Sequence, residues 1–337
     1  MKHRFTVTRS ESGRALADWL RARLKRVMPE VLRLVRHRQI RIDGQLCTEP
    51  ARRVRPGQQV DVLPAPAPRR PPSGASRNTA ATARERSVPR PVIRFADAAI
   101  VVVDKPAGLT TMRHKEEVRE FGKRARRFLP ATLAHLLPEL LAAKPSGRPG
   151  AVRAVHRIDK ETSGLVVFAR NVEAERELGR QFRAHATDRV YLTLVRGKAK
   201  PGRIESYLIR DRGDGRRGST SKPGEGQRAV THVRVAEELG DYTLVECRLE
   251  TGRTHQVRIH LGEAGTPLCG DHVYDRPPHG APWPDGSGAP RVLLHAARLG
   301  FEHPATGKPM AWSSPLPKDM ADVLQRLRKH ARDEPPG

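Results

Sequence analysis

The chain has 337 residues, of which 37% are apolar and 30% charged, and 63 Lys and Arg against 37 Asp and Glu give a formal charge of +26. This length favours two domains, the low apolar share predicts an exposed linker or tail, and the charge favours a polyanionic partner such as nucleic acid. The sequence lacks a membrane-spanning apolar run, a signal peptide and a cysteine pattern suited to disulfides or zinc, so we expect a cytoplasmic protein.

The first predicted domain covers residues 1–63. Apolar residues recur at helical spacing over residues 14–36 and predict two helices, the second opened by Pro29. A short alternating strand over residues 39–42, an Asp-Gly turn and a strand at residues 60–62 follow. The pattern indicates a compact α/β module with a basic surface, and a generic small domain with a solvated basic face is the alternative interpretation.

Residues 64–90 are rich in Pro, Ala, Arg and Ser and show no periodicity, which predicts a flexible linker. Its arginines could touch the phosphates of a nucleic acid, or the segment could be a solvated tether. A larger domain is expected over residues 91–325, followed by a C-terminal tail at residues 326–337. Within the larger domain, residues 113–150 form a basic segment whose role the sequence leaves open.

The larger domain contains more predicted strands than helices. A strand is expected at residues 99–103, a helix at residues 131–142 that is interrupted at Pro138, and a terminal helix at residues 319–330. Because strands and helices do not alternate regularly, we expect an α+β fold with a mixed or antiparallel sheet and flanking helices. The further strands are expected at residues 165–169, 190–195, 229–235, 242–249 and 293–301.

The most distinctive candidate for chemistry is Asp159, in a loop that leads into a buried strand. Arg157 and Lys160 lie beside it in sequence, and neighbouring cations favour the ionised carboxylate. Gly164 would allow backbone or substrate to approach closely, and Thr162 could hydrogen-bond to the loop backbone and stiffen it. From these residues alone, a structural salt bridge is an alternative role for Asp159.

Tyr191 lies in the second distinctive segment, a strand of alternating character. The alternation places Tyr191, Thr193 and Val195 on one face of the strand. The tyrosine ring could stack on a base, and its hydroxyl could hydrogen-bond or move a proton. Plain packing in the core is the alternative role.

Residues 250–260 form the third segment, in which a glycine-containing turn leads into a run of basic side chains. His255, Gln256 and Arg258 could meet a carboxylate or a phosphate there. A basic surface segment is the alternative interpretation. The stretch has no Cys and no obvious third ligand, so we expect no zinc site.

Taken together, these segments resemble the three signature motifs of RluA-type pseudouridine synthases. The matching stretches are, in chain order, HRIDKETSGLVVFAR, RVYLTLVRG and LETGRTHQVRIHL, with IVVVDKPAGL upstream and PLCGDHVY downstream. The first domain resembles the RNA-binding domain of ribosomal protein S4, through ADWLRARL, VLRLVRHRQIRIDGQ and VRPGQQVDV. The resemblance implies a small α/β RNA-binding module followed by the larger catalytic domain of the pseudouridine synthase fold.

The resemblance also implies roles for individual residues. Asp159 would be the family's nucleophilic or proton-abstracting aspartate, Tyr191 the tyrosine that stacks on the target base and joins in proton transfer, and Arg258 the basic residue that pairs with the aspartate. Arg157 matches an arginine that helps to displace the flipped nucleotide. The other candidate substrate-binding residues are His156, Thr162, Arg253, His255 and Gln256.

The implied function is the isomerisation of uridine to pseudouridine in structured RNA, on a nucleotide pulled out of its stack, without a metal or an organic cofactor. A single motif carboxylate favours isomerisation over hydrolysis, since glycosidases usually use two. The expected partner is ribosomal RNA, or alternatively transfer RNA, with no DNA and no membrane, and the expected state is a monomer. A noncatalytic RNA-binding or ribosome-assembly protein is the main alternative, and a nucleoside or glycan hydrolase is another.

Overall fold

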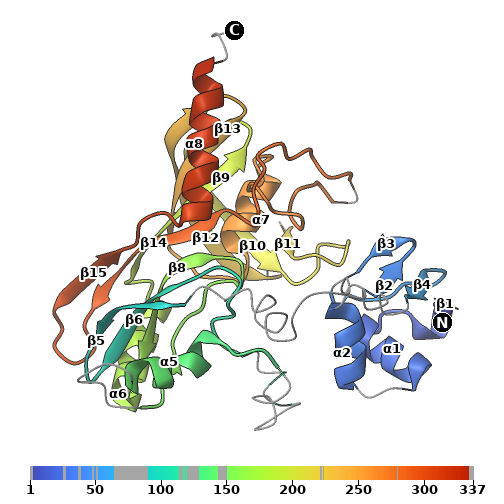
Figure 1. Ribbon diagram of the computed structural model, residues 1–337, viewed down its shortest axis with the longest axis horizontal. Helices are drawn as coiled ribbons and strands as arrows, with labels where there is room; N and C mark the ends of the chain where they lie inside the picture. The colour runs from blue at the N-terminus through green and yellow to red at the C-terminus, as the bar shows by residue number, and fades with distance from the viewer. Residues whose placement is uncertain are drawn as a thin grey trace, which may run out of the picture. The chain divides into compact units, whose positions relative to one another are not determined.

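The computed structural model divides into two compact units, residues 1–84 and 85–337 (Figure 1). The predicted linker at residues 64–90 lies almost wholly outside the described residues, as does most of the basic segment 113–150. None of the helices in the described ranges has the length and apolar character needed to cross a bilayer. The described residues are 3–25, 28–36, 39–47, 49–50, 52–63, 90–113, 117, 119, 129–142, 150–220, 222, 224–278 and 280–333.

The first unit packs two helices against a four-stranded antiparallel sheet with the order β1-β4-β2-β3. The two predicted helices and the two predicted strands, β2 and β4, are confirmed, and β1 and β3 are additional strands that the sequence pattern did not indicate. Apolar side chains from both helices and the sheet form one core, which includes Trp19, Leu20, Val35 and Ile42. The elements are β1 His3–Thr6, η1 Arg9–Glu11, α1 Leu16–Leu24, α2 Met28–Arg36, β2 Ile40–Ile42, β3 Gln45–Leu46 and β4 Gln59–Val62.

The second unit is built on an 11-stranded sheet, with a main path in the order β11-β10-β12-β13-β9-β14-β8-β6-β5. Among the described residues every strand pair is antiparallel except β8 with β14, so the predicted mixed sheet is confirmed. The strands are β5 Val92–Ala96, β6 Ile100–Lys105, β7 Arg153–Ala154, β8 Ser163–Ala169, β9 Asp188–Arg196, β10 Gly202–Ile209, β11 Gly218–Thr220, β12 Gln227–Leu239, β13 Tyr242–Leu249, β14 Leu294–Glu302 and β15 Pro309–Ser313.

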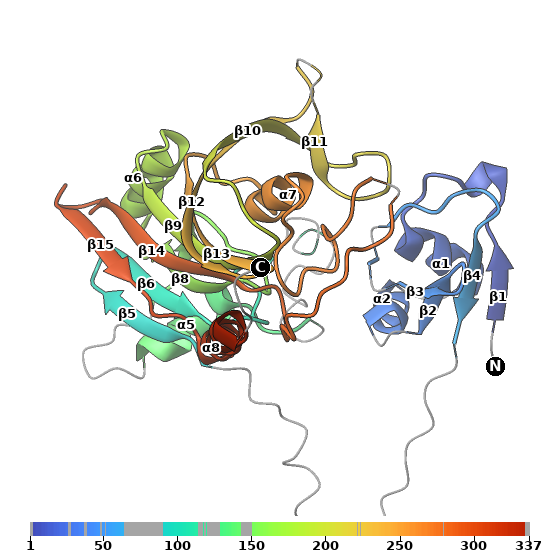
Figure 2. The ribbon, with the colours of Figure 1, turned by 90° about the horizontal axis from the view of Figure 1, so that it is seen from above.

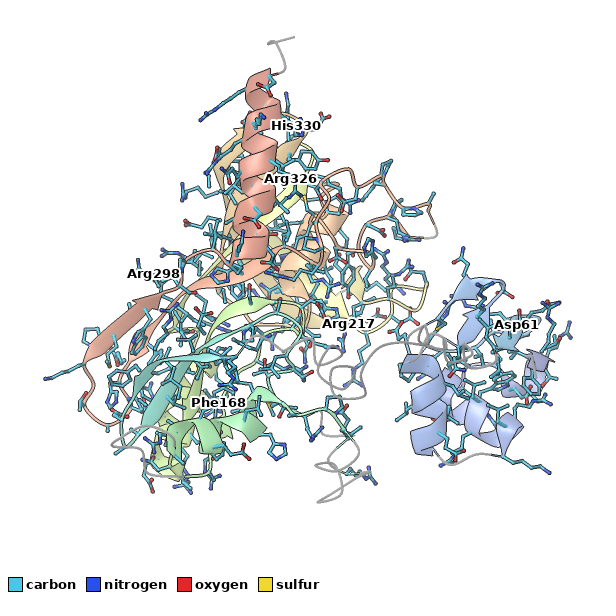
Figure 3. The ribbon with its side chains drawn as sticks, in the orientation of Figure 1. Asp61, Phe168, Arg217, Arg298, Arg326 and His330 are labelled. Atoms are coloured by element: carbon cyan, nitrogen blue, oxygen red, sulfur yellow. The ribbon has the colours of Figure 1, made fainter. Side chains whose placement is uncertain are left out.

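Four helices flank this sheet in the described part of the second unit: α5 Leu133–Ala142, α6 Val172–Arg183, α7 Gln256–Glu263 and α8 Lys318–Asp333. The short helix α7 lies inside the curve that β10, β12 and β13 make (Figure 2). Helix α8 buries Met320, Val323, Leu324 and Leu327 in a separate apolar cluster. Arg326 and His330, on the same helix, are exposed (Figure 3). Since α8 continues to Asp333, residues 326–333 are helical and do not belong to the predicted tail.

Helix α5 differs from the sequence prediction at Pro138. The predicted interruption is wrong, because Pro138 lies within a continuous helix. A proline at this position removes one backbone hydrogen bond and crowds the preceding turn. Leu133, Leu137 and Leu141 lie on one face and are at most 2% exposed, so we attribute the survival of the helix to this burial.

The parallel contact between β8 and β14 fixes the strand that follows the Asp159 loop. Gly164 pairs with Ala296 in this contact and has φ of 109°, a region that favours glycine. A Cβ atom at Gly164 would overlap the backbone carbonyl of Ala296. The close approach expected at Gly164 is therefore an approach of backbone, and it joins β8 to the rest of the core, in which Phe168 is fully buried (Figure 3).

Replacement of Gly164 by Ala should destabilise the protein by about 2 kcal/mol or more, because the new methyl group adds backbone strain and steric overlap at once. The free energy of unfolding measured in urea checks this expectation. Gly150→Ala is the matched control, since nothing lies within 4 Å of a Cβ atom built there. Equal stability of the two variants would show that β8 and β14 do not approach as described.

Candidate active site

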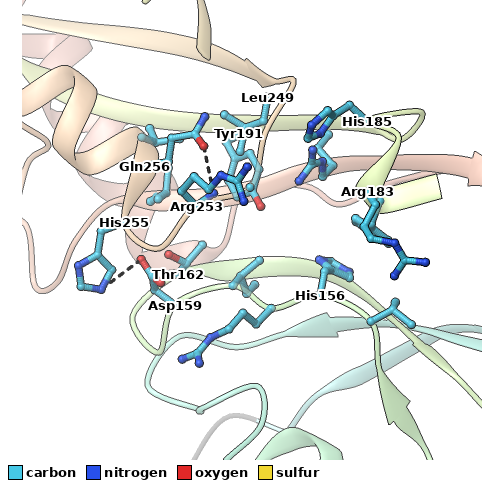
Figure 4. A pocket seen from close by; sticks show the side chains of 18 of the residues that line it. His156, Asp159, Thr162, Arg183, His185, Tyr191, Leu249, Arg253, His255 and Gln256 are labelled. Carbon is cyan, nitrogen blue, oxygen red and sulfur yellow. Dashed lines mark hydrogen bonds and ion pairs between the residues drawn. The ribbon is translucent and has the colours of Figure 1, made fainter. Parts of the chain in front are cut away.

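A cleft of about 430 Å³ opens in the second unit, between the loop that precedes β8, the end of α6, strand β9 and the loop that precedes α7 (Figure 4). It brings together residues as distant in the chain as Val155 and Leu294. Eight of the nine predicted site residues line it: His156, Arg157, Asp159, Thr162, Tyr191, Arg253, His255 and Gln256. The ninth, Arg258, lies one turn into α7 and is 7% exposed.

The loop that carries Asp159 is held by side chains from the end of β6 and from the segment that follows it. Lys105, which is fully buried, donates from Nζ to the carbonyl oxygens of Pro106, Leu109 and Lys160 at 2.9, 2.7 and 3.1 Å. The Thr111 hydroxyl donates to the carbonyl of Ile158 at 2.7 Å. The backbones of both neighbours of Asp159 are thus fixed, and none of these contacts uses the Asp159 carboxylate.

The carboxylate of Asp159 faces two basic side chains. Its Oδ2 lies 3.8 Å from Nε2 of His255 and 3.8 Å from Nη1 of Arg258. The side chain of Asp159 is 20% exposed, and that of Arg258 is 9% exposed. The predicted proximity of Arg258 to Asp159 is therefore present, but 3.8 Å is longer than a direct hydrogen bond.

The closer partner of Arg258 is Asp271, which the sequence interpretation did not single out. Nε and Nη2 of Arg258 donate to the two oxygens of Asp271 at 2.6 and 2.9 Å, and the Asp271 side chain is fully buried. Burial opposes both charges, but the paired hydrogen bonds raise the pKa of Arg258 and lower the pKa of Asp271. Asp271 therefore binds two nitrogens of the guanidinium, and the third, Nη1, faces Asp159.

Tyr274 completes this arrangement and was also missed. Its ring lies 5.0 Å from the guanidinium carbon of Arg258, and its hydroxyl lies 2.8 Å from Nδ1 of His255. Burial raises the pKa of Tyr274, so the phenol keeps its proton and can donate it to Nδ1. In that tautomer Nε2 of His255 carries hydrogen and points it toward Asp159. The signal for Asp271 and Tyr274 was present in the stretch PLCGDHVY.

His255 occupies a backbone conformation with φ of 60°, directly before α7. This left-handed conformation is uncommon for a residue other than glycine and is found at functional sites. Burial lowers the pKa of His255 to about 4, although the charge of Asp159 opposes the shift. At neutral pH His255 is therefore uncharged, and its Nε2 lies near the carboxylate of Asp159 without a direct hydrogen bond to it.

His156 has a mainly internal role on the other side of the cleft. Its Nε2 accepts the backbone N–H of Val167 at 3.0 Å, and its ring stacks on Phe182 with centroids 4.4 Å apart. Burial, with a contribution from the positive charge of Arg189, lowers the pKa of His156 to about 3. The neutral ring therefore ties the loop that carries Asp159 to β8 and α6.

These histidines predict that stability falls as the pH drops below neutral. In the unfolded chain a histidine takes up its proton near pH 6.5. In the folded protein burial lowers the pKa to about 3 for His156 and to about 4 for His255 and His260. Each such histidine lowers the free energy of unfolding by at most about 1.4 kcal/mol per pH unit in this window. Thermal unfolding measured between pH 7 and 4.5 checks this, and a midpoint that rises on acidification would contradict it.

Gln256 lines the cleft but uses its amide inside the protein. Its Oε1 accepts from the Thr251 hydroxyl at 2.7 Å and from the Arg253 backbone N–H at 3.0 Å. Its Nε2 donates to the carbonyl of Val230 at 2.9 Å and to the Thr231 hydroxyl at 3.0 Å. All four hydrogen-bonding positions of the amide are therefore occupied, and Gln256 holds the loop that presents His255.

The other candidates differ in how far they reach into the cleft. Tyr191 comes from β9, is 9% exposed, and lies in the main core cluster, and burial raises its pKa above the usual range. Thr162 is 2% exposed, and its backbone N–H donates to the carbonyl of Asp159 at 3.1 Å. Arg157 is exposed at the cleft, and Nε of Arg253 donates to the carbonyl of Arg228 at 3.0 Å.

The donor set of the cleft does not suit a metal ion. Within the described ranges, no group of three or more His, Cys, Asp and Glu side chains is arranged to hold one. The groups that face Asp159 are the guanidinium of Arg258 and the neutral imidazole of His255, and the phenol of Tyr274 contacts both of them. This arrangement suits the stabilisation of one carboxylate and the contact of a polar substrate.

Two segments of the chain match families of known proteins. Residues 99–263 match the RNA pseudouridylate synthase family, and residues 16–60 match the S4 domain family. The chain is 40% identical over 241 residues to the ribosomal large subunit pseudouridine synthase D of Nitrosomonas europaea, and this stretch is 70% of the chain but 65% of that relative. The matching stretch thus spans slightly less than two thirds of this relative's length.

Two further relatives are matched over a larger share of their length. An uncharacterized RNA pseudouridine synthase of Bacillus subtilis is 37% identical over 247 residues, which are 71% of the chain and 73% of the relative. The ribosomal large subunit pseudouridine synthase D of Zymomonas mobilis is 38% identical over 238 residues, 70% of the chain and 72% of the relative.

Among solved structures, human RNA pseudouridylate synthase domain containing 4 superposes with a TM-score of 0.56 at 23% identity, over 70% of the chain and 93% of that structure, which shows a shared fold. The sequence matches go further than the fold. On the strength of these relatives and of the matched family segment, the chain belongs to the RNA pseudouridylate synthase family and carries an S4 domain near its N-terminus.

Proposed function

We propose that the protein isomerises specific uridines to pseudouridine in ribosomal RNA. The observation that carries this proposal is that Asp159 and Tyr191 line one cleft, with Arg258 3.8 Å from Asp159, in a chain of the RNA pseudouridylate synthase family. The three residues come from a loop, a strand and a helix that are distant in sequence. Their meeting is what a shared catalytic task requires and what independent structural roles would not explain.

In this proposal Asp159 acts on the ribose of the target nucleotide, as a nucleophile or as a proton acceptor. The reaction breaks the N-glycosidic bond, turns the uracil ring and rejoins it to the sugar through carbon five. A carboxylate next to the sugar carbon can stabilise the positive charge that develops there. Arg258 and His255, both 3.8 Å from Oδ2, would orient this carboxylate without closing the space in front of it.

Tyr191 and Arg157 are proposed to handle the displaced base. Extrusion of a nucleotide costs a few kcal/mol, and least in loops, so the enzyme must offer contacts in return. The Tyr191 ring lines the cleft and would stack on the uracil, and the exposed Arg157 would fill the gap that the base leaves. Thr162, Arg253 and His255 would contact the nucleotide, whereas His156 and Gln256 would mainly hold the walls.

The RNA partner is proposed on separate grounds. Relatives of the chain are named ribosomal large subunit pseudouridine synthases, and an S4 domain precedes the catalytic unit. We propose residues 1–63 as an RNA-binding domain and residues 91–325, extended by the rest of α8, as the catalytic domain. The charge of +26 would supply affinity for phosphates. A monomer that acts on ribosomal RNA in the cytoplasm is the simplest form of this proposal.

Mapping pseudouridines in ribosomal and transfer RNA from a strain that lacks this gene tests the function and names the target. We expect one or a few positions of large-subunit ribosomal RNA to lose pseudouridine, and a plasmid copy of the gene to restore them. A plasmid copy with Asp159→Asn is the control that separates catalysis from RNA binding. Loss restored equally by both copies would favour the noncatalytic RNA-binding protein instead.

Tyr191→Phe should lower the rate of pseudouridine formation by about 10²-fold or more if the hydroxyl transfers a proton, since general acid–base groups contribute that much. The ring remains, so the affinity for RNA should stay within about twofold. Single-turnover rates at saturating RNA, with binding measured separately, check this. A rate equal to that of the wild type would leave stacking as the only role of Tyr191.

A further inference from the structure

Four Lys and Arg residues in the described part of the chain are at most 8% exposed: Lys105, Arg189, Arg196 and Arg258. Burial of a cation is costly unless counter-charges or hydrogen bonds compensate it. Lys105 donates to three carbonyl oxygens, and Arg258 pairs with Asp271. Arg196 lies within hydrogen-bonding distance of four carbonyl oxygens. Arg189 is the exception, because its compensation is far smaller.

Arg189 makes one hydrogen bond to a protein oxygen, from Nη2 to the carbonyl of Glu250 at 2.8 Å. Its Nε is buried without a hydrogen-bond partner, and no ion pair of Arg189 is found within the described ranges. The adjacent Asp188 is directed elsewhere and pairs with Arg298 at 2.9 Å. The carboxylate of Glu250 likewise lies 2.7 Å from His232. Burial accordingly lowers the pKa of Arg189.

The uncompensated guanidinium lies in the wall of the candidate active site. Arg189 lines the same cleft as Asp159 and comes two residues before Tyr191 on β9, so both side chains leave the same face of the strand. Its guanidinium carbon lies 5.6 Å from the centre of the Phe182 ring, on which His156 stacks.

Gly252 makes room for the guanidinium. A Cβ atom built on Gly252 would lie 2.5 Å from Nη1 of Arg189, so the absence of a side chain at residue 252 is what admits Arg189 to this position. Two elements thus position Arg189: strand β9, which also carries Tyr191, and the turn before α7, which contains Gly252. Such a built site for a cation without an anion indicates that the anion arrives with a ligand.

We propose that Arg189 binds an anionic oxygen of the nucleotide held in the cleft and so receives its counter-charge from the RNA substrate. This inference deepens the proposed function and rests on it, since it takes the ligand of the cleft to be RNA. Arg189 becomes a substrate-contacting residue in addition to Asp159, Tyr191 and Arg258. The bound anion also explains why the protein tolerates a buried guanidinium that it does not neutralise itself.

Two parts of the nucleotide carry such an oxygen. One is the phosphodiester next to the target uridine. The other is the uracil ring, because breakage of the glycosidic bond leaves the electron pair on N1 and spreads negative charge to the ring carbonyl oxygens, while positive charge at the sugar carbon faces Asp159. Both charges act on Tyr191: burial raises the pKa of its hydroxyl most, Arg189 lowers it and Asp159 raises it.

The test uses full-length protein and a fragment of large-subunit ribosomal RNA in which the pseudouridine has first been mapped with the wild type. The variants are Arg189→Gln, Arg189→Lys and Gly252→Ala, the last of which keeps the arginine but displaces it. Arg234→Gln is the matched control, since Arg234 is exposed, pairs with Glu246 and does not line the cleft. Phosphate contacts are read by ethylation interference, which neutralises single phosphates, and chemistry is read from single-turnover rates at saturating RNA.

If the anion is the phosphodiester, Arg189→Gln and Gly252→Ala bind the fragment about tenfold more weakly and lose one interference signal next to the pseudouridine. If the anion is the uracil, all phosphate signals remain and the saturating rate falls by about 100-fold or more. Either result supports the proposal, and Arg189→Lys should recover part of the loss in both. Wild-type signals, affinity and rate in Arg189→Gln would overturn it.

Separate controls distinguish a loss of folding and a failure of the proposed function from a failure of this inference. We expect Arg189→Gln to unfold at a temperature no lower than the wild type, because the substitution removes a buried charge. If a substitution at residue 189 prevented folding, Gly252→Ala would still decide the question, since it retains Arg189. If the wild-type protein formed no pseudouridine, the proposed function would fail by itself. The interference experiment would then use whole large-subunit ribosomal RNA, and the loss or retention of a phosphate signal in the variants would still decide whether the cleft binds an RNA phosphate.

Discussion

Asp159→Asn is expected to abolish pseudouridine formation, with a loss of about 10³-fold or more, while the variant still folds and binds RNA. The amide has the shape of the carboxylate but carries no charge, so it can neither attack the sugar nor stabilise positive charge there. Lys105 and Thr111 hold the loop through backbone atoms of Ile158 and Lys160, and these contacts do not involve the Asp159 side chain. The variant therefore tests chemistry separately from structure.

The control for this variant is another carboxylate-to-amide change in the same unit. Asp322 lies on α8, its side chain is 48% exposed and pairs with Lys318, and neither residue lines the cleft. Asp322→Asn should keep wild-type turnover, and both variants should bind ribosomal RNA with equal affinity. An Asp159→Asn protein that turns over at the wild-type rate would remove Asp159 from the mechanism.

Arg258→Met should lose both activity and stability. Removal of the guanidinium leaves the fully buried carboxylate of Asp271 without its partner, and the loss of one member of a buried pair costs about 3–5 kcal/mol. It also removes the cation 3.8 Å from Asp159. The free energy of unfolding and the single-turnover rate, measured on the same preparation, check the two effects.

The double variant Arg258→Met/Asp271→Asn separates these effects. The asparagine oxygen can still accept the backbone N–H groups of Val273 and Tyr274, which Asp271 accepts at 2.9 and 3.2 Å. Because removal of both charges avoids the unpaired anion, most of the lost stability should return. Activity should not return, since the cation at Asp159 is still missing. Recovery of activity together with stability would make Arg258 a purely structural residue.

The candidate site was largely predictable where its chemistry lies within short stretches of sequence. Asp159, Tyr191 and His255 each stand in a segment whose composition is unusual, and the cleft brings these segments together. Asp271 and Tyr274 were not predicted, because a lone carboxylate and a lone tyrosine in a loop have no meaning until Arg258 and His255 lie beside them. The role of Arg189 was hidden for a related reason, since an unpaired charge is recognised only when all its neighbours are known.

The fold was predictable to a similar degree. Alternation and helical spacing identified most strands and both helices of the first unit, because these patterns reflect which side is buried. The pairing of β8 with β14 joins segments about 130 residues apart, and no local pattern reports it. Helix α6 was missed although Asn171 accepts the backbone N–H of Ala174 in the structure, as an N-cap residue does. Pro138 was overinterpreted, because one proline does not break a helix whose other face is buried.

The most direct test of the proposed function is chemical. Purified protein incubated with unmodified large-subunit ribosomal RNA should convert uridine to pseudouridine at defined positions, with no free uracil in the supernatant. Release of uracil would identify a hydrolase instead. RNA that is bound by the protein yet contains no pseudouridine after prolonged incubation would contradict the enzymatic account.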